Sequence, residues 1–211
     1  MAVVSELMDR FGRTYAEQAG ITLTDKPSPL YRLLVLTVLL SKPISADVAV
    51  AAARELSDAG LRTPSRTRAS TWRQRVAALG RAGYRRYDAS TAELLGAGAE
   101  LLRDRWHDDL RELRREGGDA EGIERLLLEV PGIGPTGAAI YLREVQGAWP
   151  EVAPYVDERA AEGAEVLGLP PTPTELKALA PRGETGLVRL IAACVRVALE
   201  RDPARMRAEL A

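Results

Sequence analysis

Residues 130–136 read Val130-Pro131-Gly132-Ile133-Gly134-Pro135-Thr136, and this stretch decides the fold. Glycines such as Gly132 and Gly134 can adopt positive φ and let another backbone approach closely. Pro135 suits the first position of a helix, because the N–H that proline lacks has no partner within a helix at that position. The stretch therefore predicts two helices joined by a very short hairpin, together spanning residues 122–146.

The predicted hairpin has the chemistry of a phosphate site. It turns unpaired backbone N–H groups outward at a helix N-terminus, where partial positive charge attracts a phosphate oxygen. Contacts of this kind position a nucleic acid without reading its sequence. An ordinary turn between two helices is the alternative interpretation. Two glycines around an apolar residue, with prolines on both sides, favour phosphate binding by residues Gly132, Ile133, Gly134, Pro135 and Thr136.

Composition is that of a folded globular protein. The chain has 211 residues, of which 46% are hydrophobic and 28% are charged, enough for one large domain or two small ones that share a cleft. The N-terminus carries acidic residues and a helical period instead of a basic start and an apolar run. The longest apolar stretch, residues 33–40, is too short to span a bilayer. We expect a cytoplasmic protein without a membrane partner.

Cysteine and histidine each occur once, as Cys194 and His107. A single cysteine excludes an intramolecular disulfide and a cysteine-ligated iron–sulfur cluster, which needs about four thiolates. We expect no metal site and no nucleophilic dyad built on histidine. Cys194 is expected to be a buried core thiol and His107 an exposed surface residue, so any chemistry must rest on carboxylates, lysine or hydroxyls.

Charge is segregated although the net charge is only −1. Between Asp58 and Asp88 there is no acidic residue, and a field of this kind can attract phosphates locally. A solvated arginine face is the alternative interpretation. We select Arg85 and Arg86 as DNA-binding candidates from the arginines of this segment, which are Arg62, Arg66, Arg68, Arg73, Arg75, Arg81, Arg85 and Arg86.

Apolar residues recur at helical spacing along the whole chain, and no stretch alternates with the period of a strand. The pattern therefore predicts an all-α fold. The segment before residue 30 is expected to be a loop punctuated by Pro27 and Pro29, and the very apolar helix that follows is expected to be central. The expected helices outside the hairpin are residues 3–18, 30–41, 46–59, 67–79, 88–106, 156–167, 173–180 and 184–200, and the first hairpin helix is expected near residues 120–129.

The hairpin, followed by Val156-Asp157, resembles the helix-hairpin-helix superfamily of DNA glycosylases. The likeness to the endonuclease III branch covers roughly residues 25–170 and rests on Leu39-Leu40-Ser41, Asp47-Val48, Ala82-Gly83-Tyr84 and residues 164–169. It implies a six-helix domain, residues 22–133, ending in the hairpin. A second helical lobe, residues 1–21 and 134–211, would be formed from both termini, with a cleft between the two.

The resemblance also implies an activity, namely base excision on double-stranded DNA by a monomer at the bacterial nucleoid. Asp157 matches the family aspartate, with Tyr155 beside the pocket, and a carboxylate there can stabilise oxocarbenium charge or activate water once the base has left the stack. Without the hairpin, Asp157 would be an ordinary helix N-cap. A structural monovalent cation at the hairpin is the one cofactor that the resemblance leaves open.

Two positions depart from the family pattern. Thr136 stands where bifunctional members have a lysine nucleophile, so we expect a monofunctional N-glycosylase. Lys42, in Ser41-Lys42-Pro43-Ile44-Ser45, could instead act as the amine of a lyase, or be a solvated lysine at a helix end. The glutamine that usually fills the gap left by the flipped base is missing there, and Lys42 or Ile44 could be the wedge.

The sequence leaves three alternatives open. The aromatic residues Trp72, Tyr84, Tyr87 and Trp149 could stack on bases or simply pack within the protein. The unusual junction at Lys42 and Pro43 also allows a protein that binds DNA structure through the hairpin without catalysing a reaction. The lesion that would be the substrate cannot be chosen from the sequence.

Overall fold

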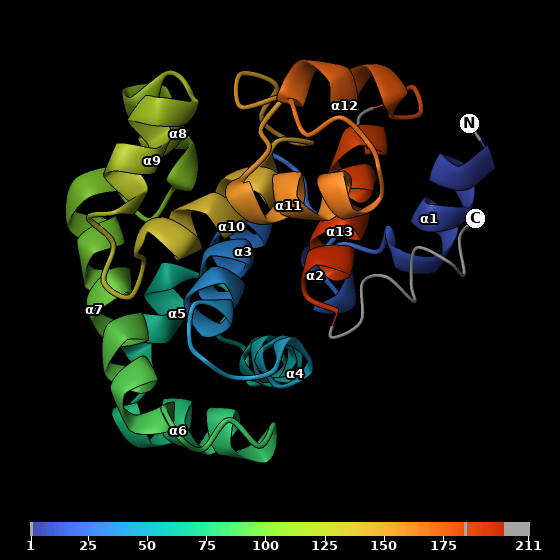
Figure 1. The fold of residues 1–211 in the computed structure, drawn as a ribbon. Helices are drawn as coiled ribbons and strands as arrows, with labels where there is room; N and C mark the ends of the chain where they lie inside the picture. Colours follow the sequence, from blue (N-terminus) through green and yellow to red (C-terminus); the bar gives the residue numbers. More distant parts are fainter. Residues whose placement is uncertain (1, 184, 201–211) are drawn as a thin grey trace. The chain divides into compact units, whose positions relative to one another are not determined.

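The computed structural model describes residues 2–183 and 185–200, and all regular secondary structure in this part of the chain is helical (Figure 1). The all-α prediction is therefore confirmed. The helices are α1 Ala2–Phe11, α2 Tyr15–Gln18, α3 Pro27–Leu40, α4 Ala46–Asp58, α5 Pro64–Ala69, α6 Trp72–Arg81, α7 Asp88–Trp106, α8 Leu110–Gly117, α9 Ala120–Leu127, α10 Pro135–Val145, α11 Glu158–Val166, α12 Pro173–Leu179 and α13 Gly186–Ala198.

The helices form two compact units. The central unit is Ala16–Leu142, and the terminal unit consists of the described residues of Met1–Tyr15 and Arg143–Ala211. The sequence predicts boundaries at 21/22 and 133/134, which lie six and nine positions from the boundaries of these units. The second boundary falls inside α10 rather than at the hairpin.

The core of the central unit is built around α3, which packs against α4, α7 and α8 (Figure 1). Its apolar residues Leu30, Leu33, Leu36 and Leu39 are fully buried, as expected for a central helix. The loop expected around Pro27 and Pro29 is wrong, because both prolines lie in the first turn of α3. Proline is tolerated there since the first N–H groups of a helix have no intrahelical partner.

In the terminal unit, α13 packs against α1, α11 and α12. Ten residues of α13 are buried, among them Cys194, so the prediction of a core thiol is confirmed. Burial raises the pKa of the Cys194 thiol to about 12, which keeps it protonated at neutral pH. At Gly163 of α11, an added Cβ would lie 1.9 Å from the carbonyl oxygen of Cys194. The two helices can approach this closely only because position 163 has no side chain.

The helices of the structure differ from the expected ones in three places. The helix expected over residues 3–18 is interrupted between Phe11 and Tyr15, so it forms α1 and α2. The helix expected over residues 67–79 is two helices, because Thr71 starts a new one with a capping box: its side chain accepts from the N–H of Gln74, whose side chain bonds back to Thr71. The third difference is α8, which the apolar pattern did not predict.

Candidate functional site

The turn between α9 and α10 is fixed to the core of the central unit. Gly132 adopts a φ of 90°, as expected for a glycine that turns the chain. A Cβ added there would lie 3.1 Å from Val38 of α3 and 3.4 Å from Leu94 of α7. Ile133 is 6% exposed, and its N–H donates to the carbonyl of Val130 at 2.9 Å. The apolar residue between the glycines therefore anchors the turn.

The N-terminus of α10 has no side-chain cap. The first hydrogen bond of the helix runs from the N–H of Ala138 to the carbonyl of Gly134 at 2.9 Å. The N–H groups of Gly134, Thr136 and Gly137 donate to no atom of the residues that the structure describes. Six other described helices have side-chain caps, at Ser45, Thr63, Thr71, Asp109, Asp119 and Asp157, whereas α3, α7, α12 and α13 have none. The open amides of α10 are thus available to an external acceptor.

Gly134 differs from Gly132 in its backbone conformation and in the space around it. We expected that both could take positive φ, but among these two only Gly132 does. A Cβ added at Gly134 would meet no atom within 4 Å. Neither backbone conformation nor packing within the chain therefore demands a glycine at position 134. Its lack of a side chain leaves open space next to the free amides.

The junction after α3 lies against this same helix end. A Cβ added at Gly137 would be 2.8 Å from the hydroxyl oxygen of Ser41, which itself donates to the carbonyl of Thr37 at 2.7 Å. Lys42 and Ile44 follow in a tight turn and are both half-buried, and Lys42 forms no ion pair within the described part of the chain. The structure thus brings the junction that bears the predicted amine and wedge beside the hairpin.

Four of the arginines between Asp58 and Asp88 already have partners within the protein. Arg75 is 9% exposed and donates to the carbonyl oxygens of Ala92, Thr67 and Ser70, so it is a structural residue. Arg68 forms a bidentate ion pair with Asp108, with contacts of 2.5 and 2.8 Å. At the surface, Arg81 pairs with Glu55 at 2.6 Å and Arg62 lies 3.7 Å from Asp58.

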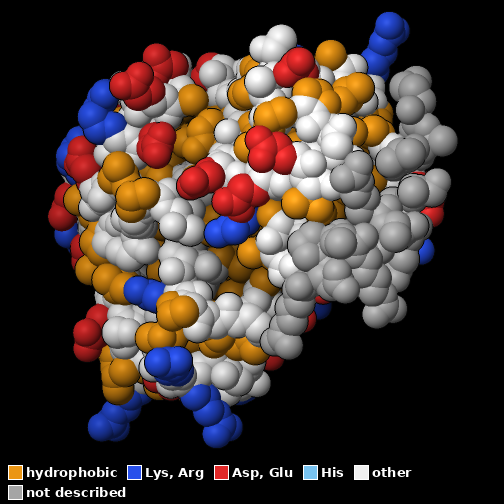
Figure 2. Space-filling view, in the orientation of Figure 1, with side chains coloured by type: hydrophobic (Ala, Val, Ile, Leu, Met, Phe, Trp, Pro, Cys, Tyr) orange, Lys and Arg blue, Asp and Glu red, His pale blue; other side chains and the backbone are white. Residues whose placement is uncertain are grey.

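The remaining arginines of this segment, Arg66, Arg73, Arg85 and Arg86, are exposed and form no ion pair within the described residues. Arg86 stacks over the ring of Tyr87 at 5.3 Å. Figure 2 shows basic side chains projecting from the end of the central unit where α6 lies. The exposed basic surface therefore has four of the eight arginines of the segment, and these four include Arg85 and Arg86, which were selected from the sequence.

The four aromatic candidates also divide into buried and exposed residues. Tyr84 and Trp149 are fully buried and therefore pack within the protein. Trp72 is 42% exposed and donates through its ring N–H to the carbonyl of Ala89 at 3.2 Å, while Tyr87 is half-buried. His107 lies on the surface, as expected, with 80% of its side chain exposed.

Asp157, in the terminal unit, uses both of its carboxylate oxygens. Oδ1 accepts the N–H of Ala160 at 3.0 Å and so caps α11. Oδ2 accepts from Nη1 of Arg143 on α10 at 2.5 Å. The two side chains are 9% and 7% exposed, which makes this an almost completely buried ion pair. The two contacts fix the orientation of the carboxylate, and the guanidinium of Arg143 is its counter-charge.

Gln146, the residue directly after α10, holds the backbone that leads to Asp157. The side-chain amide of Gln146 donates to the carbonyl of Tyr155 at 2.9 Å and accepts the N–H of Tyr155 at 3.0 Å. Arg143 lies in the last turn of α10, and Gln146 follows three positions later, just past the end of the helix. Sequence reasoning missed both residues, although two long polar side chains three positions apart, at and just after the end of a largely apolar helix, were a usable signal.

The predicted site residues therefore fall into two groups. The hairpin, Lys42, Ile44, Arg85 and Arg86 belong to the central unit, while Tyr155 and Asp157 belong to the terminal unit. In residues 2–183 and 185–200, no three or more His, Cys, Asp or Glu side chains are grouped so that they could hold a metal ion. No described helix is both long enough and apolar enough to cross a membrane.

No family model matches this chain, and no curated protein matches it either. A function for this chain therefore rests on the geometry of the site residues in the central unit and in the terminal unit.

Proposed function

We propose that this chain binds double-stranded DNA through a helix-hairpin-helix motif formed by α9, the turn and α10, and that it is a monofunctional DNA glycosylase. The observation that carries the proposal is the N-terminus of α10, where the first N–H groups have no partner among the described residues and a Cβ added at Gly134 would meet open space. A phosphate oxygen is the acceptor that a helix N-terminus favours. The exposed Arg85 and Arg86 would add electrostatic attraction from the same unit.

In this proposal Asp157 stabilises the positive charge that develops on the sugar as the base leaves, and water completes the hydrolysis. The base–sugar bond breaks, and one water molecule supplies hydroxide to the sugar carbon and a proton to the departing base. Thr136 has no amine, so no imine with the sugar forms at that position. The two-lobed arrangement around a cleft stays a prediction of the family resemblance, as do the single-subunit state and the cation at the hairpin.

One observation favours a second candidate, a non-catalytic protein that binds DNA structure. Asp157 is engaged by Arg143 and by its own helix cap, and a carboxylate with these partners resembles a structural N-cap. Catalysis would need Arg143 to release the carboxylate, or to share it with the sugar cation. The two candidates have the same hairpin and differ only in the use of Asp157.

DNA binding is tested with Gly134→Ala. This variant adds a methyl group beside the free amides without a clash inside the protein, so thermal unfolding should be nearly unchanged while duplex affinity falls about tenfold, as expected when phosphate contacts are lost. Gly80→Ala is the matched control, because a Cβ there also meets no atom within 4 Å. Equal affinities for the two variants, measured by fluorescence anisotropy over a salt series, would remove the hairpin from DNA binding.

Catalysis is tested with duplexes that carry alkylated, oxidised, deaminated or mismatched bases, followed by alkaline cleavage at abasic sites. Base release by the wild type that is lost in Asp157→Asn, with duplex affinity retained, supports the glycosylase. Salt-dependent binding without any product supports the non-catalytic candidate. Borohydride trapping of a covalent adduct that disappears in Lys42→Ala would instead show a lyase that uses Lys42.

A further inference from the structure

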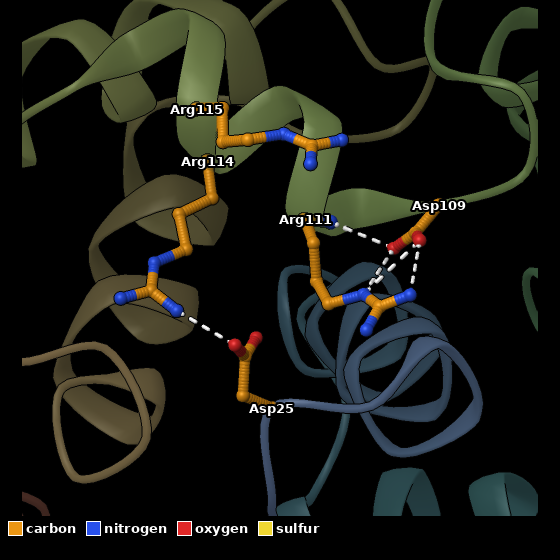
Figure 3. A pocket seen from close by; sticks show the side chains of 5 residues that line it. All are labelled: Asp25, Asp109, Arg111, Arg114 and Arg115. Carbon is orange, nitrogen blue, oxygen red and sulfur yellow. Dashed lines mark hydrogen bonds and ion pairs between the residues drawn. The ribbon is translucent and has the colours of Figure 1, made fainter.

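A pocket of about 340 Å³ opens in the central unit, away from the residues assigned above (Figure 3). Its lining consists of three arginines and two aspartates, which leaves one excess positive charge: Asp25, Asp109, Arg111, Arg114 and Arg115. The volume lies within the range of about 300–1,000 Å³ that is usual for small-ligand sites. The lining has no aromatic or aliphatic residue, so the chemistry of a ligand must be ionic.

The arginines are presented by a rigid helix. All three lie on α8, whose other face buries Leu110 and Leu113 at 1% and 0% exposure. Asp109 caps this helix by accepting the N–H of Arg111 at 3.0 Å, and Asp25 comes from the loop before α3. The charged face of α8 is therefore held toward the pocket by packing on its apolar face.

The pocket already binds oxyanions of the protein itself. Nη1 of Arg114 lies 2.8 Å from a carboxylate oxygen of Asp25, which is 89 positions away in the chain. Nε and Nη2 of Arg111 contact the carboxylate of Asp109 at 3.0 and 2.6 Å. A guanidinium group recognises carboxylate and phosphate with the same planar pair of N–H groups. The geometry that holds these carboxylates also suits a phosphate.

Donors remain in the pocket after these pairs are formed. Among the described residues, the contacts of Arg111 use Nε and Nη2 but not Nη1. Arg115 is 71% exposed, and a carboxylate oxygen of Glu112 lies 3.4 Å from its Nη2. Figure 3 shows Arg111 and Arg114 extending from α8 toward the segment that bears Asp25. An incoming anion would thus meet two guanidinium groups on one side of the helix and a third nearby.

We propose that this pocket binds a phosphate group through Arg111, Arg114 and Arg115, and that Asp25 competes with the phosphate for Arg114. A phosphate has more negative charge and more acceptor oxygens than a carboxylate, so it can bridge two guanidinium groups that Asp25 alone cannot. The group could come from a small phosphorylated compound or from a DNA backbone. The inference does not depend on the proposed function, because it uses different residues.

The test is titration calorimetry of the whole protein with inorganic phosphate and pyrophosphate, with ionic strength held constant by chloride. Arg115→Gln should weaken binding about fivefold, the size expected for one largely exposed charge pair. Asp25→Asn should strengthen binding, because it removes the competing carboxylate. The matched controls are Arg54→Gln and Asp47→Asn, which make the same charge changes at exposed positions of α4.

The proposal is overturned if neither anion binds below about 10 mM, or if the control variants shift the affinity as much as the pocket variants. Thermal unfolding of each variant shows whether the fold is retained.

A second experiment, with duplex DNA added, identifies the source of the phosphate. If DNA displaces pyrophosphate and Arg115→Gln also weakens duplex binding, the phosphate comes from the DNA backbone. If DNA does not displace pyrophosphate and Arg115→Gln leaves duplex binding unchanged, the ligand is a small compound. Because pyrophosphate binding is measured without DNA, failure of this site and failure of the hairpin remain distinguishable.

Discussion

Arg143 and Asp157 form an almost completely buried ion pair, 14 positions apart in sequence, in which the guanidinium of a helix-borne arginine holds the carboxylate that caps the next helix. The desolvated charges stabilise each other only while both are present. The pair therefore links the stability of the terminal unit to the residue proposed for catalysis.

We expect Arg143→Met to destabilise the protein by about 3 kcal/mol, because it leaves the buried carboxylate of Asp157 without a counter-charge. The free energy of unfolding is measured by urea titration. Arg143→Met combined with Asp157→Asn should recover part of this loss, since no unpaired charge remains. If the single variant unfolds like the wild type, the ion pair does not stabilise the native state.

We expect Gly163→Ala to destabilise the protein by about 3 kcal/mol or more, because its Cβ would overlap the carbonyl oxygen of Cys194 and force α11 away from α13. Glu165→Ala, an exposed change on the same helix, is the control and should have little effect. The midpoints of thermal unfolding compare the two. Similar midpoints would show that α11 and α13 do not pack as closely as described.

We expect the thiol of Cys194 to be unreactive in the folded protein. Burial raises its pKa to about 12, so the thiolate needed for attack on a disulfide reagent is scarce at pH 8, and access is blocked as well. Ellman's reagent should release its chromophore only after guanidinium is added. Rapid reaction under native conditions would contradict the burial of this residue.

We expect Asp109 to make stability depend on pH in acid. Its hydrogen bonds to Arg111 lower the pKa of the carboxyl in the folded state. The resulting stabilisation is fully present above the unfolded pKa of about 4 and is lost as the pH falls through the lower folded value. Asp109→Asn keeps a capping side chain but removes the charge, so it should cost about 1 kcal/mol at pH 6.

The same comparison at low pH checks the assignment. Once the carboxyl of Asp109 is protonated in the wild type, the difference in unfolding free energy between wild type and Asp109→Asn should be close to zero. A difference that is equally large at pH 6 and in strong acid would show that the charge of Asp109 does not contribute.

The sequence predicted the helices whose apolar stripes are long, and its errors have physical reasons. α8 was missed because only Leu110 and Leu113 form its buried stripe, although Asp109 and Gly118 mark its two ends. The apolar period over residues 3–18 continues through Tyr15, yet α1 ends at Phe11, directly before Gly12. The apolar period indicates which residues are buried, but it does not indicate where a helix ends.

The candidate site was predicted only in part for a similar reason. A hairpin is local, so Gly132 and Pro135 revealed the turn directly. The partners of a charged side chain are not local: nothing in the sequence shows that Arg75 points inward to carbonyl oxygens or that Arg143 meets Asp157. The sequence therefore identified which residues carry charge but not which charges are already satisfied within the protein.

The contrast between Gly134 and Gly163 has a consequence for mutational libraries. A library selected only for soluble, folded protein should accept alanine or serine at position 134 while rejecting every side chain at position 163. A second round selected for function should restore glycine at position 134 alone. The two rounds together would separate the positions that the architecture constrains from those constrained by a molecule outside it.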